Sequence, residues 1–369
     1  MKRLILLCLL ISGTIQLHAQ NDVTTFILVR HAEKSTDDPR DPSLSEEGIK
    51  RAEALKTMLS QADIAALYSS PYKRTKGTVQ PIAEAKAEVE KCAWVCRYYA
   101  DHSEEFLRSK VIETDASKSY VSYEPLGVIY AIMPWNFPFW QVFRFAAPTL
   151  MAGNTALLKH APNVTRCALD IEEIFAEAGA PVNAFRTLIL DNDHASKVIE
   201  HPLVRAVSLT GSERAGVAVA STAGSVLKSS LLELGGSNAV IVLDDADLDA
   251  AVDTGFKARF LNSGQSCIAG KRFLVMDSIY DAYIEKFKAK VEQLKCADPL
   301  SGEASIGPLA RVDLAEGIER QVNQSIKNGA ELVCGGKRDG AKYEATVLKN
   351  VKPGMAAFDE ETFGPLAAT

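Results

Sequence analysis

The sequence predicts an α/β protein built on parallel sheets. Short apolar runs rich in β-branched residues alternate with helical patterns, and no internal repeat or low-complexity tract interrupts them. The composition is ordinary for a globular protein, with 47% hydrophobic and 24% charged residues. Strands that alternate with helices are typical of parallel sheets, because each helix returns the chain to the start of the next strand. The length of 369 residues is sufficient for two or three domains.

The first twenty residues predict a secretory signal peptide. Lys2-Arg3 form a short positive region, residues 4–11 are almost wholly apolar, and Ala19 offers a small residue for cleavage. The apolar run is too short to span a bilayer comfortably. We therefore expect an exported, periplasmic chain with no membrane attachment after cleavage.

Residues 21–85 predict the opening of an α/β domain. An apolar, β-rich run at 23–30 is followed by a loop with two prolines, an amphipathic helix at 45–60 and a strand-like run at 64–68. A Ser-Ser-Pro turn then leads into a helical pattern from Tyr72. This order of strand, helix, strand and helix is suited to a parallel sheet.

Arg30 and His31 lie at the carboxyl end of the first predicted strand, where ligands bind in open α/β sheets. An arginine there can hold a phosphoryl group by paired hydrogen bonds, and a histidine can attack it. Arg74 follows the second strand, in Ser69-Ser70-Pro71-Tyr72-Lys73-Arg74-Thr75. Over residues 24–85 these features resemble the histidine phosphatase (phosphoglycerate mutase-like) superfamily, which implies Arg30, His31 and Arg74 as phosphate-pocket residues. The acidic proton donor and second histidine of that family do not follow, so we expect no turnover there.

The α/β alternation continues to the end of the chain, with no flexible linker after the first segment. A long helical pattern is established by residue 87, and the preceding helix runs straight into it. A strand-rich stretch at 119–132 leads into Pro134-Trp135-Asn136-Phe137-Pro138. Further short strands are predicted at 155–158, 184–190, 206–209 and 239–243.

Cys267, Glu233 and Asn136 suit chemistry at a carbonyl carbon. Cys267 follows Gly264-Gln265 at the end of a helical segment, and a thiolate there can attack a carbonyl. Glu233, before two glycines, can activate water, and the Asn136 amide can donate to an oxyanion. Each residue alone has a structural alternative, because a lone cysteine is more often part of the core and a lone glutamate a surface charge.

In combination and order, six motifs between residues 81 and 369 resemble the aldehyde dehydrogenase superfamily. They are Pro134-Trp135-Asn136-Phe137-Pro138, Leu158-Lys159-His160, Leu209-Thr210-Gly211-Ser212, Glu233-Leu234-Gly235-Gly236, Gly264-Gln265-Ser266-Cys267 and Glu360-Glu361-Thr362-Phe363-Gly364-Pro365. The resemblance implies a Rossmann-like dinucleotide-binding domain at 86–232 and an α/β catalytic domain at 233–369. Compared with the family, we expect the first to lack its N-terminal part and the second its C-terminal part.

The resemblance also implies the role of each site residue. Cys267 is the nucleophile, its own N–H and Asn136 stabilise the oxyanion, and Glu233 activates water to release the acid from a thioester. The implied contacts to the cofactor are Trp135 along the phosphate path, Lys159 at the adenosine ribose, Gly211 and Ser212 at the pyrophosphate, and Glu361 and Phe363 at the nicotinamide ribose and ring.

Within the superfamily, residues 132–162 and 262–272 resemble bacterial succinate semialdehyde dehydrogenases most closely. Arg144 matches an arginine that such enzymes use for the substrate carboxylate, and the alternative is an arginine on a helix surface. Many of these enzymes have a second arginine six residues before the cysteine. Here Leu261 stands at that position and Arg259 lies two residues earlier.

Two features limit the choice of cofactor and partner. After Lys159, many NAD-selective relatives carry a glutamate that repels a 2′-phosphate. This chain has His160-Ala161-Pro162 there, so either NAD or NADP is expected. The net charge of −6 and the lack of a clustered Lys/Arg run give no reason to expect nucleic acid. The partner that the resemblance implies is a small aldehyde. The family normally forms homo-oligomers, but we do not expect this where the pairing segment is missing.

Cys92 and Cys96 are spaced four apart on a predicted helix. Such a pair is either half of a metal site or two partly buried small residues. No second pair follows at ligand spacing, so we predict no metal site.

The two resemblances meet near residues 80–88, which fit the patterns of both families. The chain is then either a real fusion or two genes joined by faulty assembly of reads. Three functions remain open: an aldehyde dehydrogenase, a secreted histidine phosphatase, or a dinucleotide-binding module without catalysis. An inactive chimera is the further alternative. The predicted export also conflicts with a dehydrogenase, which is expected in the cytoplasm with its cofactor and reduced thiols.

Overall fold

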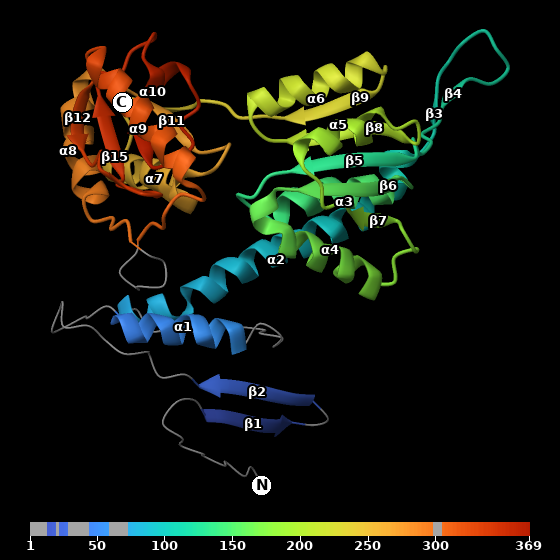
Figure 1. Cartoon of the computed structure of the whole chain (residues 1–369), viewed down its shortest axis with the longest axis horizontal. Helices are drawn as coiled ribbons and strands as arrows, with labels where there is room; N and C mark the ends of the chain where they lie inside the picture. The colour runs from blue at the N-terminus through green and yellow to red at the C-terminus, as the bar shows by residue number, and fades with distance from the viewer. Residues whose placement is uncertain (1–12, 20–21, 29–43, 59–72, 298–304) are drawn as a thin grey trace. The chain divides into compact units, whose positions relative to one another are not determined.

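The computed structural model describes residues 13–19, 22–28, 44–58, 73–297 and 305–369 (Figure 1). The chain divides into two compact units, each described here by itself. The first contains residues 1–84 and 294–308, and the second contains residues 85–293 and 309–369. None of the described helices has the length and apolar character of a membrane span.

In the first unit, β1 (Gly13–Ala19) and β2 (Asp22–Leu28) form an antiparallel hairpin. The strand predicted at 23–30 is present as β2, but the parallel pairing that we expected for it is wrong in the described residues. Only two residues separate β1 from β2, and a parallel crossover needs a dozen or more. The strand predicted at 64–68 lies outside the described residues, and the signal peptide stays a prediction.

Two helices follow in chain order. Helix α1 (Glu46–Met58) agrees with the helix predicted at 45–60, and its residues Ile49 and Ala52 pack with Leu44. Helix α2 (Lys73–Leu107) begins in the first unit and ends in the second. It confirms the uninterrupted helical segment that the sequence predicts.

The second unit contains a parallel five-stranded sheet in the order β7-β6-β5-β8-β9. Its strands are β5 (Val128–Met133), β6 (Thr155–His160), β7 (Phe185–Thr187), β8 (Val204–Thr210) and β9 (Ser229–Glu233). The order reverses direction between β5 and β8. At such a switch point the loops diverge to opposite faces of the sheet and leave a crevice for a ligand.

Helices cover both faces of this sheet (Figure 1). Ile129, Ala131 and Met133 of β5 pack against α2, α3 (Trp140–Met151) and α4 (Thr165–Glu177). The alternate residue Tyr130 belongs to the core on the other face, with α5 (Asn192–Glu200) and α6 (Glu213–Ser225). Side chains that alternate between two buried faces explain why β5 is apolar throughout.

A second five-stranded sheet has the order β10-β11-β16-β15-β12 and is parallel except for β12. Its strands are β10 (Asn238–Val242), β11 (Gly270–Val275), β12 (Glu331–Cys334), β15 (Thr346–Lys349) and β16 (Leu366–Ala368). The helices beside it are α7 (Leu248–Phe260), α8 (Tyr280–Val291), α9 (Val312–Lys327) and α10 (Ala356–Asp359). The chain crosses from one sheet to the other between Glu233 and Asn238.

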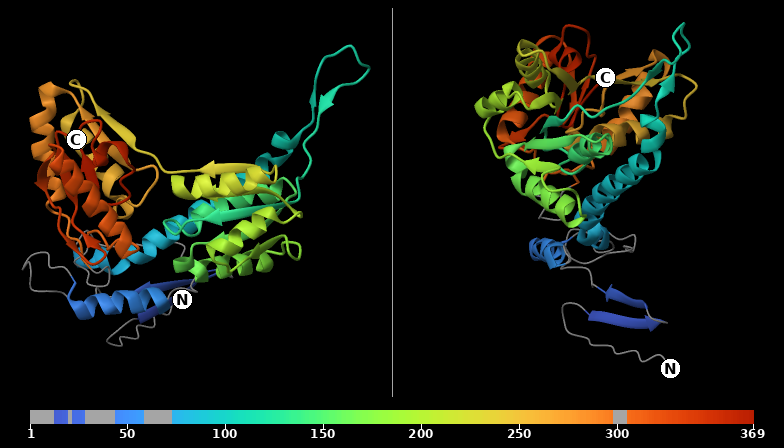
Figure 2. Two further views of the ribbon diagram at one scale, coloured as in Figure 1. Left: turned by 45° about the horizontal axis from the view of Figure 1, so that its top comes forward. Right: turned by 90° about the vertical axis from the view of Figure 1, so that its right-hand side faces the viewer.

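Two short hairpins and three 3-10 turns complete the second unit. Figure 2 shows the hairpin of β3 (Lys110–Val111) and β4 (Tyr120–Val121) projecting from the first sheet. The second hairpin pairs β13 (Arg338–Asp339) with β14 (Lys342–Tyr343). The turns are η1 (Pro162–Val164), η2 (Leu261–Gly264) and η3 (Asp277–Ile279).

Candidate active site

Four strands of the first sheet deliver predicted site residues at their carboxyl ends. Asn136 follows β5, Lys159 lies near the end of β6, Ser212 follows β8, and Glu233 ends β9. Because parallel strands end at the same edge of a sheet, the fold brings these residues to one side of it.

Cys267 lies in the loop between η2 and β11, and its side chain is half-buried. The backbone before it turns sharply through left-handed conformations at Asn262 (φ 52°), Ser263 (φ 53°) and Gly264 (φ 74°). A Cβ at Gly264 would overlap the Gly364 carbonyl, so this position requires glycine. The Cys267 carbonyl accepts hydrogen bonds from Asn238 Nδ2 at 3.2 Å and Lys271 Nζ at 3.0 Å. The loop that carries the thiol is therefore fixed through its backbone.

Asn136 contacts this cysteine loop directly. Its Nδ2 donates to the Gln265 carbonyl at 3.1 Å, and Asn262 Nδ2 donates to the Asn136 carbonyl at 2.9 Å. Its Oδ1 is buried and has no hydrogen-bond partner among the described residues. The amide retains a second N–H, so it can still donate to an oxygen atom near Cys267.

Glu233 and Arg144, predicted as general base and substrate ligand, lie side by side. Arg144 Nη1 is 3.5 Å from Glu233 Oε2, and Arg144 Nη2 donates to Thr210 Oγ1 at 3.0 Å. The Glu233 side chain is 56% exposed, whereas that of Arg144 is 33% exposed. The carboxylate can therefore reach water, and the guanidinium is held by side chains from β8 and β9.

Lys271 is a polar residue of this region that the sequence analysis did not identify. Its side chain is fully buried, and its ammonium donates to the carbonyls of Cys267 and Gly236 and to Glu361 Oε1, the last at 2.7 Å. Burial lowers the pKa of Lys271, and the Glu361 carboxylate opposes that change. The available signal was a lysine at the start of β11, whose last three residues, Phe273, Leu274 and Val275, are apolar.

Arg259 is fully buried and is not available to a substrate. Its Nη2 donates to the Gly264 and Thr362 carbonyls at 3.0 Å each and to the Gly364 carbonyl, and its Nη1 donates to Gly270. Burial lowers the pKa of Arg259 to about 9. It therefore does not replace the second substrate arginine expected from the resemblance to succinate semialdehyde dehydrogenases.

The predicted cofactor residues form two groups. Trp135 and Phe363 meet edge to face, with ring centroids 5.9 Å apart and an interplanar angle of 86°. Glu361 lies against Gly235, where an added Cβ would overlap its carboxylate. The structure therefore places the Glu361 carboxylate beside the Glu233–Gly236 loop.

The second group suits the adenosine and pyrophosphate end of a dinucleotide. Burial lowers the pKa of Lys159, whose amine makes no hydrogen bond within the described residues. Ser212 caps α6 by accepting from the Ala215 N–H at 3.3 Å, and Gly211 precedes it. The N-terminus of a helix attracts phosphate through its free N–H groups and its dipole. The residues present therefore fit a dinucleotide.

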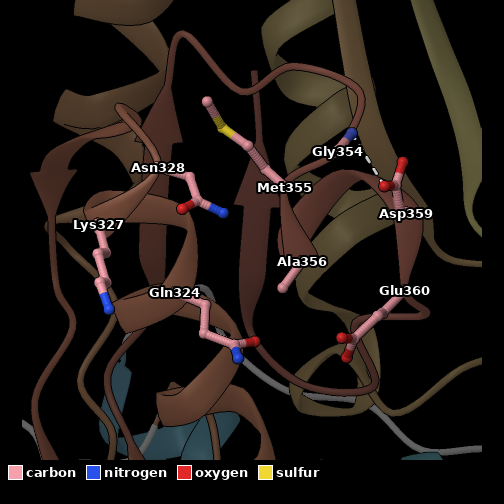
Figure 3. Close-up of a pocket in the computed structure, with 8 residues that line it drawn as sticks. All are labelled: Gln324, Lys327, Asn328, Gly354, Met355, Ala356, Asp359 and Glu360. Carbon is pink, nitrogen blue, oxygen red and sulfur yellow. Dashed lines mark hydrogen bonds between the residues drawn. The ribbon is translucent and has the colours of Figure 1, made fainter.

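Figure 3 shows a polar hollow between the end of α9 and α10. Its volume is about 340 Å³. Its lining includes Lys327, Asp359 and Glu360, and Asp359 Oδ2 accepts from the Gly354 N–H at 2.9 Å. None of the predicted site residues lines it. Among the described residues no cluster of His, Cys, Asp and Glu has the composition of a metal site.

The phosphatase residues are not placed by the structure. Arg30 and His31 lie outside the described residues. Arg74 lies on α2, but its side chain is also outside them. The phosphate pocket therefore stays a prediction.

Comparison with known proteins points to one family. The model of the "Aldehyde dehydrogenase family" matches residues 52–369. This range includes residues 80–88, where we predicted a junction, and residues 52–85 of the segment that resembles a phosphatase.

Similar curated proteins are named succinate-semialdehyde dehydrogenases. A probable NADP(+) enzyme from Synechocystis sp. is 50% identical over 289 residues, which are 78% of this chain and 64% of that protein. An NAD(P)+ enzyme from Escherichia coli is 46% identical over 297 residues, 80% of this chain and 64% of that protein. The chain thus spans about 64% of the length of these relatives.

Solved structures give the same likeness. Succinic semialdehyde dehydrogenase from Streptococcus pyogenes, in complex with NADP+, has a TM-score of 0.74 at 38% identity, covering 78% of this chain and 64% of that one. Succinate-semialdehyde dehydrogenase from Burkholderia pseudomallei has a TM-score of 0.74 at 31% identity, covering 89% of this chain and 73% of that one.

Proposed function

The chain belongs to the aldehyde dehydrogenase family, and from this premise we propose that it oxidises an aldehyde to the carboxylic acid with NAD or NADP. The observation that carries the proposal is the contact between Asn136 and the cysteine loop, with Asn136 Nδ2 3.1 Å from the Gln265 carbonyl oxygen. This contact brings an amide donor from the first sheet to the loop of a half-buried thiol on the second.

The reaction follows from the residues at this contact. The Cys267 thiolate attacks the aldehyde carbon, and the new oxyanion accepts hydrogen bonds from the Cys267 N–H and the Asn136 amide. Loss of hydride from that carbon leaves a thioester on Cys267. Glu233 then takes a proton from water, whose oxygen attacks the thioester, and the acid leaves as the thiol is restored.

The bound cofactor supplies the acceptor for the hydride. Lys159, Ser212 and Glu361 would hold it, by the ribose hydroxyls at each end and by the helix N-terminus between them. No acidic side chain follows Lys159 in His160-Ala161-Pro162 to repel a 2′-phosphate. We therefore infer that NADP is accepted as well as NAD, in agreement with the names of the similar curated proteins.

We infer that the substrate is a semialdehyde with a carboxylate, most simply succinate semialdehyde. Arg144 is the cation beside Glu233, and a substrate carboxylate would take the place of Glu233 as its partner. That exchange would leave Glu233 free to act on water.

The test is turnover of succinate semialdehyde by the purified chain, followed through the absorbance of the reduced nicotinamide. We expect activity with both NAD and NADP, and Cys267→Ala should abolish it while cofactor binding remains. Cofactor binding with no turnover, and no effect of Cys267→Ala, would instead identify a binding module.

We keep two proposals for the N-terminal region. Export rests on the pattern of residues 1–20, and cell fractionation tests it. A phosphatase pocket rests on Arg30, His31 and Arg74, and a phosphate-ester assay with His31→Ala as control tests it. We expect no phosphatase turnover, because the family's second histidine and proton donor are absent from the pattern.

A further inference from the structure

The loop that carries Trp135 and Asn136 connects β5 to α3. Helix α3 begins at Trp140, and its own N-cap residue Phe139 makes no side-chain capping hydrogen bond. The first N–H groups of a helix have no partner within the helix, so something else must satisfy them. The partner at this helix determines how firmly the preceding loop is held.

That partner is Glu88, on helix α2. Its Oε1 accepts from the N–H groups of Phe139 and Trp140, both at 2.9 Å. A carboxylate that receives two backbone N–H groups at a helix N-terminus is favoured by charge-assisted hydrogen bonds and by the helix dipole. Glu88 is 51 residues from Phe139, so this is a cap supplied by a different element.

A second contact joins the same two helices. The ammonium of Lys91, one turn after Glu88 on α2, lies 3.8 Å from the centroid of the Trp140 ring. The start of α3 is therefore held by α2 through both its backbone and its first side chain.

His160, at the end of β6, holds the other side of the loop. Its Nε2 is 2.9 Å from the Pro138 carbonyl, and its Nδ1 is 2.9 Å from the Ala161 N–H. Burial lowers the pKa of His160. Its Nδ1 also lies 3.1 Å from the Met133 carbonyl at the end of β5, so the ring contacts backbone groups on both sides of the loop. Asn136 therefore lies in a short loop whose last residues are fixed by Glu88 and His160.

We propose that Glu88 is a positioning residue for Asn136. From α2, its carboxylate caps the N-terminus of α3 and so fixes the loop that carries Asn136. The inference rests on the proposed function for the role of the Asn136 amide. The contacts of Glu88 are to the backbone N–H groups of Phe139 and Trp140. Glu88 fixes the backbone that follows the loop, and thereby the direction in which the amide donates.

The first experiment measures backbone hydrogen exchange and needs no turnover. The proteins are the wild-type chain, Glu88→Ala, Glu88→Gln and the matched control Glu104→Ala, which removes an exposed carboxylate from the same helix. We expect faster exchange across residues 135–140 in Glu88→Ala, near-wild-type exchange in Glu88→Gln, whose amide oxygen can accept the same two N–H groups, and no change in Glu104→Ala. Unchanged exchange in Glu88→Ala would overturn the proposal.

The second experiment is a double-mutant cycle on turnover. A misdirected oxyanion donor should lower kcat roughly tenfold in Glu88→Ala and leave KM within about twofold, because the amide acts mainly on the transition state. If Glu88 acts through Asn136, Glu88→Ala should cost little further in the Asn136→Ala background. A loss of equal size in both backgrounds would show that Glu88 does not act through Asn136.

The two experiments separate failure of this inference from failure of the proposed function. A chain with no aldehyde turnover, but with exchange at residues 135–140 that responds to Glu88→Ala, would refute the function and retain the capping role. Full turnover in Glu88→Ala would refute the positioning role and leave the function standing.

Discussion

Lys271 combines full burial with a positive charge, which is stable only because each hydrogen-bond partner is in place. Its ammonium joins the Cys267 carbonyl, the Gly236 carbonyl and the Glu361 carboxylate. It thus connects the nucleophile loop, the loop after Glu233 and the predicted nicotinamide-ribose ligand. A buried cation of this kind contributes through the groups it satisfies, more than through its charge alone.

Lys271→Met should lower the free energy of unfolding by about 2–4 kcal/mol, because it leaves the Gly236 carbonyl and the partly buried Glu361 carboxylate without a donor. The Cys267 carbonyl keeps its second donor, Asn238 Nδ2. Urea denaturation of the two proteins measures the difference. Lys286→Met is the matched control, since its ammonium pairs with Asp249 at the surface, and it should leave the unfolding midpoint unchanged. An equal effect of both substitutions would contradict the role given to Lys271.

Cys92 and Cys267 should differ in reactivity although both are free thiols. Burial raises the pKa of Cys92 to about 12 from the usual 9.0. The folded state thus holds this proton more tightly, so the associated stability is fully present below pH 9.0 and is lost as the pH rises towards about 12. We expect iodoacetamide to label Cys267 in the native chain at neutral pH, and Cys92 only after unfolding, as measured by peptide mass spectrometry. Rapid labelling of Cys92 in the native chain would show that its side chain is not buried.

At the scale of elements, the turn from β8 into α6 combines a structural and a predicted binding function in Ser212. Ser212→Ala should cost about 1 kcal/mol of stability through loss of the cap, and should weaken NADP binding. Ser212→Asp separates the two, because aspartate caps the helix but repels the pyrophosphate. We expect it to keep the unfolding midpoint and lose cofactor affinity, measured by fluorescence titration. If NADP affinity changes in parallel with the unfolding midpoint in both variants, Ser212 caps the helix but does not bind the cofactor.

The elements that the sequence predicts well are those with a local signal. Strands β6, β8 and β10 lie within two residues of the predicted runs, because apolar residues continue through them. Strand β7 has only three residues, Phe185–Thr187, against the seven predicted. The antiparallel partner of β2 was missed because the apolar residues before it were interpreted as an export signal.

Contacts between residues that are far apart in the sequence could not be predicted from local patterns. Glu88 meets residues 139 and 140, and Lys271 meets Glu361, which is 90 positions away. The sequence around Glu88 or Lys271 does not indicate the partner of either residue. Strand order and helix packing bring each residue to its partner. Asn136, Glu233 and Cys267 were found because their motifs resemble a family, and the structure brings Asn136 to the Cys267 loop.

At the scale of the whole molecule, the candidate site draws on both sheets of the second unit. Cys267 lies before β11 of the second sheet, and the proposed oxyanion donor Asn136 and base Glu233 lie at the ends of β5 and β9 of the first. The proposed substrate arginine lies on α3, beside that sheet. Substrate choice is therefore a property of the assembled unit, and Arg144 is the residue at which it can be tested. Arg144 Nη2 is held by Thr210 of β8, and Nη1 faces Glu233 of β9.

Arg144→Gln should raise KM for succinate semialdehyde about tenfold or more, because a carboxylate loses its only charged partner in the proposed pose. KM for butanal, which has the same carbon chain without the carboxylate, should stay within about twofold. Arg186→Gln is the matched control, since it breaks a surface ion pair between Arg186 of β7 and Glu172 of α4. An equal rise in KM for both aldehydes would mean that Arg144 acts by holding Glu233 in place and does not recognise the substrate carboxylate.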